Sequence, residues 1–301
     1  MNKSWDHHIK GFKIYLSLEK SLSENSVEAY LHDIIKLVQY FEVMGEVPVP
    51  ENVKPIHIKD FIQWINSLGV SSRSQARMIS GLKAFFSYLL MDDLIKSDPT
   101  ALIESPKIGR KLPDILSVEE IDKLISNLDL SKPEGQRNKA ILETLYSCGL
   151  RVSELVDLKI SNLNFKLGYI KVTGKGNKER LVPISPRAMK EIKYYFENRR
   201  KLKKIEKTDE NILFLTRNGR KISRIMIFNI IKGVTEKSGL KKNISPHTFR
   251  HSFATHLIDG GADLRAVQEM LGHESITTTE IYTHLDREYL RDTIIQFHPR
   301  S

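Results

Sequence analysis

The chain of 301 residues is 40% apolar, which is enough for two domains with hydrophobic cores. Its net charge of +10 lies in residues 111–301, because residues 1–110 hold 13 basic and 13 acidic side chains. The excess favours a polyanionic partner such as nucleic acid, although positive charge can also serve solubility alone. The single cysteine excludes an internal disulfide, and no run reaches the roughly 18 consecutive apolar residues of a membrane span.

The cysteine and the first ten residues favour a reducing compartment. Cys148 lies in an apolar run, which predicts a small core residue rather than a nucleophile. Residues 1–10 contain Asp6 and two histidines and lack the apolar stretch of a signal peptide. We therefore expect a cytoplasmic protein without a membrane partner.

The first ninety residues predict a small helical bundle. Apolar residues recur at helical spacing from Ile9 and again after Ser23, which is the expected N-cap of the second helix. Three prolines predict a loop over 47–55, and two more helices are expected over 58–67 and 74–91. No strand pattern interrupts this region.

Two arginines without a neighbouring acid stand out at the start of the last of these helices. Arg73 and Arg77 are four residues apart, so they share one helix face. That face either lies against a DNA backbone or is simply solvated, and the sequence leaves both interpretations open.

A proline-rich stretch then separates two domains. Pro99, Pro106 and Pro113 mark this stretch as a linker. We predict a first domain over 1–94, a linker over 95–111 and a second domain over 112–301.

The second domain mixes helices with a few short strands. Ser117 with Glu120 forms a capping box, and a helix over 136–148 is expected to end at Gly149. Two β-rich runs, 167–173 and 179–184, flank a Gly-Lys-Gly-Asn turn and predict a hairpin. The third strand is expected over 212–216, and a further helix should begin at Ser245–Pro246.

Four short segments contain residues that can do chemistry. They are Cys148–Leu155, Thr173–Arg180, Ser245–His251 and Leu271–His284. Taken singly, each has a structural explanation, since Arg151 can pair with Glu154 and Tyr282 can be a packed aromatic. The function therefore depends on the segments taken together.

Familiar catalytic motifs fail in detail. A phosphate loop needs Ser or Thr after its lysine, but Gly176 follows Lys175. His247 and His251 have the spacing of a zinc helix, yet Thr248 stands where the water-activating glutamate would be. No Gly-x-Ser-x-Gly elbow occurs. Nothing in the sequence predicts a metal or a cofactor.

Together, the segments resemble the catalytic set of the tyrosine recombinases, also called phage integrases. The matching residues, in order, are Arg151, Lys175, His247, Arg250, His273 and Tyr282. The likeness covers almost the whole chain, including the tail His298–Pro299–Arg300. The compact length favours the Xer group, of the XerC or XerD type, over phage integrases with extra arm-binding domains.

The resemblance implies a mainly α fold. The first domain would be a helical core-binding bundle of the SAM-like type. The second would be an α+β catalytic domain with a small three-stranded antiparallel sheet, and the two would form a C-shaped clamp on DNA. A C-terminal helix over about 285–301 would exchange between subunits, with packing on its own domain as the alternative.

The resemblance also implies how the phosphodiester is held. Arg151 and Arg250 are the expected clamp, since a guanidinium donates two parallel hydrogen bonds and stays charged. This positive charge would replace the metal ions of other phosphoryl-transfer enzymes. His273 would donate a further hydrogen bond to the phosphate.

The remaining catalytic residues are expected to move protons and form the covalent bond. Tyr282 would be the nucleophile and His247 its base. Lys175, at the hairpin tip, would be the general acid, and a mobile hairpin could deliver or withdraw it. The same hairpin offers Lys178 and Arg180 as candidate DNA backbone contacts.

The implied function is site-specific DNA strand exchange of the topoisomerase IB-like type. Its partners would be a double-stranded recombination site, a homo- or hetero-tetramer with a paralogous recombinase, and a septal DNA translocase. The cellular task would be resolution of chromosome dimers. The alternatives are an integrase or invertase of a mobile or phase-variable element, and a non-catalytic DNA-binding protein of the same fold.

Overall fold

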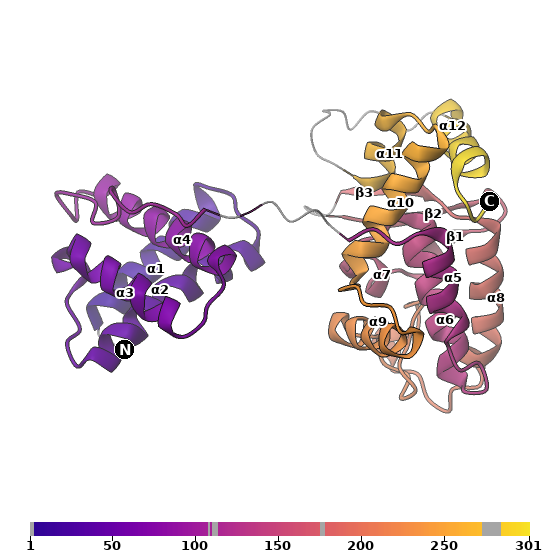
Figure 1. Cartoon of the computed structure of the whole chain (residues 1–301), viewed down its shortest axis with the longest axis horizontal. Coiled ribbons are helices and arrows are strands. Elements are labelled where there is room, and N and C mark those ends of the chain that lie inside the picture. The colour runs from indigo at the N-terminus through magenta and orange to yellow at the C-terminus, as the bar shows by residue number, and fades with distance from the viewer. Residues whose placement is uncertain (1–2, 108, 110–113, 175–177, 273–283) are drawn as a thin grey trace. The chain divides into compact units, whose positions relative to one another are not determined.

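A computed structural model describes residues 3–107, 109, 114–174, 178–272 and 284–301, without the side chains of residue 3 and of 284–288. The chain forms two compact units, residues 1–111 and residues 112–301 (Figure 1). In the described ranges, no helix is both long enough and apolar enough to cross a membrane.

The first unit is the helical bundle that the sequence predicts. Its helices are α1 (Lys3–Leu18), α2 (Glu24–Met44), α3 (Pro55–Ser67) and α4 (Ser72–Met91), with a 3-10 turn at Pro50–Asn52. Aromatic rings fill the centre, where Trp5 stacks on Phe85 at 5.9 Å between centroids. Ile95 and Ile103, from the stretch expected as linker, are buried in the same core.

The second unit is built from helices around one core and a small sheet. The helices are α5 (Val118–Ser126), α6 (Pro133–Cys148), α7 (Val152–Val156), α8 (Pro186–Arg200), α9 (Arg224–Ser238), α10 (Pro246–Gly260), α11 (Leu264–Leu271) and α12 (His284–Phe297), with 3-10 turns at Ile160–Asn162 and Lys207–Asp209. Capping confirms two predicted boundaries, because the Ser117 hydroxyl accepts the amide of Glu120 and Gly149 ends α6 with φ of 55°.

The small sheet is antiparallel and three-stranded, as expected, but its third strand was predicted wrongly. Strands β1 (Leu163–Asn164), β2 (Tyr169–Thr173) and β3 (Glu179–Pro183) pair in that order. Residues 212–216 make only isolated bridges, Ile212 with Lys159 and Leu215 with Lys221. An apolar run of this kind is also what a buried connection requires, and Leu213 and Phe214 are indeed buried.

Helix α12 packs on its own unit, which was the alternative to docking on a neighbouring subunit. It contacts α10, α11 and β3, and Figure 1 shows it beside α10 and α11. Leu290 and Ile294 are buried in the core of the second unit. Beyond the helix, Arg300 is buried as well and lies 2.6 Å from Asp122 of α5. In the single chain, these side chains are therefore not available to a neighbour.

Candidate active site

Three of the six predicted catalytic residues lie in the described part of the second unit. Arg151 is the N-cap of α7, and His247 and Arg250 lie in the first two turns of α10. Lys175, His273 and Tyr282 lie outside the described residues, although Gly174 and Gly272, the residues directly before Lys175 and His273, are described.

Gly149 allows α6 to lie close to α10. It follows α6 in the left-handed region, and a Cβ at this position would collide with the ring of Phe253 of α10. A glycine is therefore needed both for the backbone turn and for the close approach of α6 to α10. Arg151 follows two residues after Gly149, whose carbonyl accepts a hydrogen bond from Arg250.

Arg250 is fixed by backbone carbonyls. Its side chain is 9% exposed, and Nη1 donates to Gly149 O at 2.6 Å while Nη2 donates to Leu271 O at 2.5 Å. Burial, together with the charge of Arg151, lowers the pKa of Arg250 to about 10. The guanidinium is therefore still charged at neutral pH, as a phosphate clamp requires.

Arg151 is the more open of the two guanidinium groups. Its side chain is 33% exposed, with Nη1 2.9 Å from Glu154 Oε1 and Nη2 donating to Gly272 O at 3.1 Å. The ion pair between Arg151 and Glu154 that the sequence allows is therefore present. It does not remove Arg151 from the site, because a guanidinium has five donors.

Glu154 is a central residue of this cluster that the sequence does not single out. Its carboxylate is buried, and it accepts hydrogen bonds from the Arg151 backbone amide and side chain and from Arg180. Burial alone would raise the pKa of Glu154, but the bonds and charges of Arg180 and Arg151 hold that pKa below its ordinary value. The spacing of Arg151 and Glu154 in a capping-box position was the available signal.

Arg180 does not lie where the sequence prediction placed it. Its side chain is 7% exposed, and its guanidinium bonds to both Glu154 oxygens and to Met270 O. A side chain buried in this way holds the protein core together and is not the exposed DNA backbone contact that the sequence predicts, so that prediction is corrected. Lys178, the other hairpin candidate, is exposed.

His247 has the electrostatic surroundings of a base. Partial burial, the neighbouring His251, and the charges of Arg250 and Arg151 lower its pKa below 6.5. The imidazole is therefore neutral at pH 7 and able to accept a proton.

The two arginines of the first unit differ in their surroundings. Arg77 Nη1 lies 2.7 Å from Oδ2 of Asp33, whose side chain is buried. Arg73 is exposed. Arg77 thus has a structural task besides any contact with DNA.

In the ranges that the structure describes, no group of three or more His, Cys, Asp or Glu side chains is arranged to hold a metal ion. Cys148 is buried, and burial raises the pKa of its thiol, as fits a core residue.

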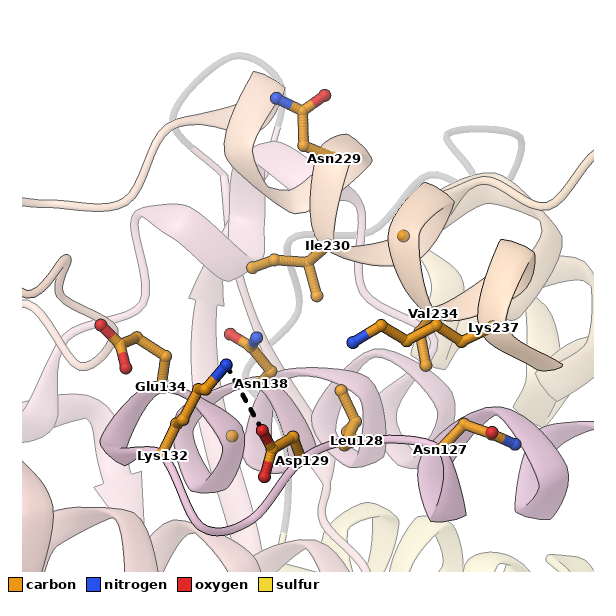
Figure 2. Close-up of a pocket in the computed structure, with 12 residues that line it drawn as sticks. Asn127, Leu128, Asp129, Lys132, Glu134, Asn138, Asn229, Ile230, Val234 and Lys237 are labelled. Atoms are coloured by element: carbon orange, nitrogen blue, oxygen red, sulfur yellow. Dashed lines mark ion pairs between the residues drawn. The ribbon is translucent and has the colours of Figure 1, made fainter.

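A cavity of about 210 Å³ lies elsewhere in the second unit, between α9 and the loop from α5 to α6. Lys132 Nζ lies 3.5 Å from Asp129 Oδ2. Figure 2 shows this pair on one side of the cavity, with Ile230 and Val234 of α9 opposite. Of the predicted catalytic residues that the structure describes, Arg151, His247 and Arg250, none lines this cavity.

Family models match both units of the chain. The phage integrase family matches residues 114–288, and the phage integrase N-terminal SAM-like domain matches residues 9–92. A helical bundle followed by an integrase-type catalytic unit defines a DNA strand-exchange enzyme. The chain belongs to the phage integrase family, the tyrosine recombinases.

Curated relatives are similar over their full length. The tyrosine recombinase XerD of Listeria monocytogenes serovar 1/2a is 42% identical over 293 residues, 97% of this chain and 99% of the relative. XerD of Staphylococcus saprophyticus subsp. saprophyticus is 40% identical over 296 residues, 98% of this chain and all of the relative.

A solved structure supports the fold. The XerH recombinase bound to its difH substrate before cleavage matches with a TM-score of 0.67 at 24% identity, covering 86% of this chain and 77% of XerH.

Proposed function

We propose that this recombinase cuts and rejoins DNA through a 3′-phosphotyrosyl bond to Tyr282 and resolves chromosome dimers. One observation carries the chemistry. Arg151 and Arg250 bond to the carbonyls of Gly272 and Leu271, the two residues directly before His273, and His247 lies one helical turn from Arg250. Arg151, His247 and Arg250 thus belong to one neighbourhood, together with the residue directly before His273.

The reaction is a transesterification that this side-chain set supports. The Tyr282 hydroxyl loses its proton to His247 and attacks phosphorus. The bond from phosphorus to the 5′ oxygen breaks, and Lys175 protonates that oxygen. Arg151, Arg250 and His273 hold the non-bridging oxygens, where negative charge accumulates. The phosphotyrosyl ester conserves the bond, so the 5′ hydroxyl of a second duplex can reverse the step without ATP.

The XerD relatives support the cellular task. Likeness at 40–42% identity over nearly the whole length favours chromosome-dimer resolution over service to a mobile or phase-variable element. Exchange between two duplexes needs four strand cuts, so we propose a tetramer, either of this chain or with a paralogous recombinase. A septal DNA translocase would be its activating partner.

A nicked DNA substrate tests the chemistry. The Tyr282→Phe variant would first be used to select binding duplexes from a randomised pool. A selected duplex nicked beside the cut position should then trap the wild type as a covalent adduct, because the short strand diffuses away. Tyr282→Phe should bind equally well and form no adduct.

Tyr289→Phe is the matched control. Tyr289 lies seven residues further on in α12 and is exposed, so its loss should leave adduct formation unchanged. Absence of an adduct with the wild type on a tightly bound site would overturn the proposed chemistry and favour a non-catalytic DNA-binding protein.

The cellular task has a separate test. Deletion of the gene should give a fraction of cells with unsegregated chromosomes at the septum, and this fraction should vanish in a strain that cannot form dimers by homologous recombination. Normal segregation together with a loss of element excision or promoter inversion would instead assign the protein to a mobile or phase-variable element.

A further inference from the structure

Three arginines meet three consecutive carbonyl groups at the end of α11. Arg180 Nε donates to Met270 O at 2.9 Å, Arg250 Nη2 to Leu271 O at 2.5 Å, and Arg151 Nη2 to Gly272 O at 3.1 Å. The last carbonyls of a helix have no amide partner within the helix and carry partial negative charge. The guanidinium groups satisfy these carbonyls, and they come from β3, from α10 and from the start of α7.

Arg180 differs from the other two because all three of its guanidinium nitrogens donate hydrogen bonds within the protein. Nη1 lies 2.7 Å from Glu154 Oε1 and Nη2 lies 2.9 Å from Glu154 Oε2, while Nε serves Met270. The side chain is 7% exposed, against 33% for Arg151. Arg180 is therefore closed off from solvent, whereas Arg151 is partly open to it.

The carboxylate that Arg180 holds is the one that orients Arg151. Glu154 Oε2 accepts the backbone amide of Arg151 at 2.8 Å, and Oε1 accepts its Nη1 at 2.9 Å. Arg180 thus fixes Glu154, and Glu154 fixes one arm of the clamp. The other end of Arg180 fixes the helix end that precedes His273.

Arg180 also lies against the turn that begins the Lys175 hairpin. A Cβ built on Gly174 would lie 3.4 Å from Arg180 Nη1 and 3.6 Å from Glu154 Oε1. Gly272 is closer still, with φ of 66° and a Cβ that would lie 3.1 Å from Arg180 Cδ. The residues that immediately precede Lys175 and His273 therefore both pack on this one side chain.

We propose that Arg180 is a positioning residue for DNA cleavage, which joins the β3 strand, Glu154 and the end of α11 and so holds in place Arg151 and the two glycines directly before Lys175 and His273. This inference rests on the proposed function. It predicts that Arg180 matters for the rate of the chemical step and not for holding DNA, because the side chain is buried.

The test separates cleavage from binding. Arg180→Gln would be measured for affinity on the selected duplex and for single-turnover cleavage of the nicked duplex at saturating protein. Affinity should stay within about threefold of wild type, since one buried side chain adds no phosphate contact. The cleavage rate should fall by about 100-fold, the usual effect of a displacement near 1 Å at a reacting centre.

Arg187→Gln is the matched control for a lost buried ion pair. Arg187 Nε lies 2.8 Å from Glu143 Oε1, a buried carboxylate of α6, and Nη2 donates to Asp122 Oδ1 of α5 at 3.1 Å, so its ion-pair and hydrogen-bond partners lie outside the Arg180 cluster. The substitution removes the same charge from beside a buried carboxylate, but it should leave the cleavage rate unchanged.

Arg180→Lys guards against a variant that fails to fold. Lysine keeps the charge beside Glu154, but one ammonium cannot span both carboxylate oxygens and Met270 O. We expect a folded protein that binds DNA normally but cleaves it about tenfold more slowly than the wild type, or slower still. Full cleavage by Arg180→Lys or Arg180→Gln would overturn the inference, as would a loss of affinity in parallel with the rate.

The wild-type measurement keeps the two proposals distinct. If the wild type forms no adduct on the nicked duplex, the proposed function fails. If the wild type forms the adduct and Arg180→Gln forms it equally fast, only the role of Arg180 fails.

Discussion

Arg250 donates from Nη2 to the carbonyl oxygen of Leu271 across 2.5 Å, so the predicted phosphate clamp is bonded to the backbone just before His273. Its other terminal nitrogen is held by Gly149 O at the end of α6. These bonds fix the plane of the guanidinium in advance. A phosphate then meets donors that need no reorganisation, which is the main source of electrostatic catalysis.

Arg250→Lys should therefore abolish most cleavage while keeping the charge. Lysine cannot donate to two carbonyls in a fixed plane and also meet a phosphate. We expect a cleavage rate lower by about 10²- to 10³-fold, as for loss of one preorganised donor. The measurement is single-turnover cleavage of the nicked duplex. Arg199→Lys is the control, since Arg199 also bonds two backbone carbonyls, of Glu210 and Ile212. Comparable losses in both variants would show that the effect is one of stability.

The pH dependence of cleavage should follow His247. Its pKa lies below 6.5 in the folded chain, so the imidazole stays neutral as the pH falls from 8 to its ordinary titration range. The cleavage rate should hold over that interval and decline only below it, once the base is protonated. His251→Gln removes one cause of the low pKa, so the decline should move to higher pH. His7→Gln in the first unit should leave the profile unchanged, and an unchanged profile in His251→Gln as well would exclude His247 as the base.

The packing of α12 predicts a contrast between two neighbouring isoleucines. Ile294 is buried in the core of its own unit, whereas Ile295 is exposed. Ile294→Ala should lower the free energy of unfolding by about 2–5 kcal/mol, as for a cavity in a core. Ile295→Ala should change it by no more than about 0.5 kcal/mol. Urea denaturation at low protein concentration measures both, and a neutral Ile294→Ala would mean that the helix does not pack on its own unit in solution.

The first unit offers a test of the open question about its two arginines. Arg73→Ala removes an exposed charge. If this face meets DNA, the slope of the logarithm of the binding constant against the logarithm of salt concentration should decrease in magnitude by about one, without a change in stability. Arg77→Ala should instead destabilise the first unit by about 1–3 kcal/mol, because it leaves the buried Asp33 carboxylate without its partner. Salt titrations of DNA binding and thermal melts distinguish the two, and an unchanged salt slope in Arg73→Ala would leave only the solvated face.

The sequence predicts the elements of the site better than the contacts between them. Local signals suffice for Ser117, Gly149 and the hairpin, since capping and turn chemistry depend on neighbours in the chain. The third strand was misplaced because a buried connection and a strand share the same apolar pattern. Arg180 was misassigned because its partners, Glu154 and Met270, lie 26 and 90 residues away. A basic residue near a turn reads as a surface charge unless the fold supplies a buried carboxylate.

The arginines at the end of α11 recognise backbone atoms, which has a consequence for how this segment can drift during evolution. Met270 and Leu271 are free to exchange for other apolar residues of similar volume, because such swaps usually cost less than about 1.5 kcal/mol and leave the carbonyls in place. Gly272 has less freedom, since its backbone conformation and its close contact with Arg180 both disfavour a side chain. In a saturation mutagenesis screen, tolerance should therefore drop sharply from Leu271 to Gly272.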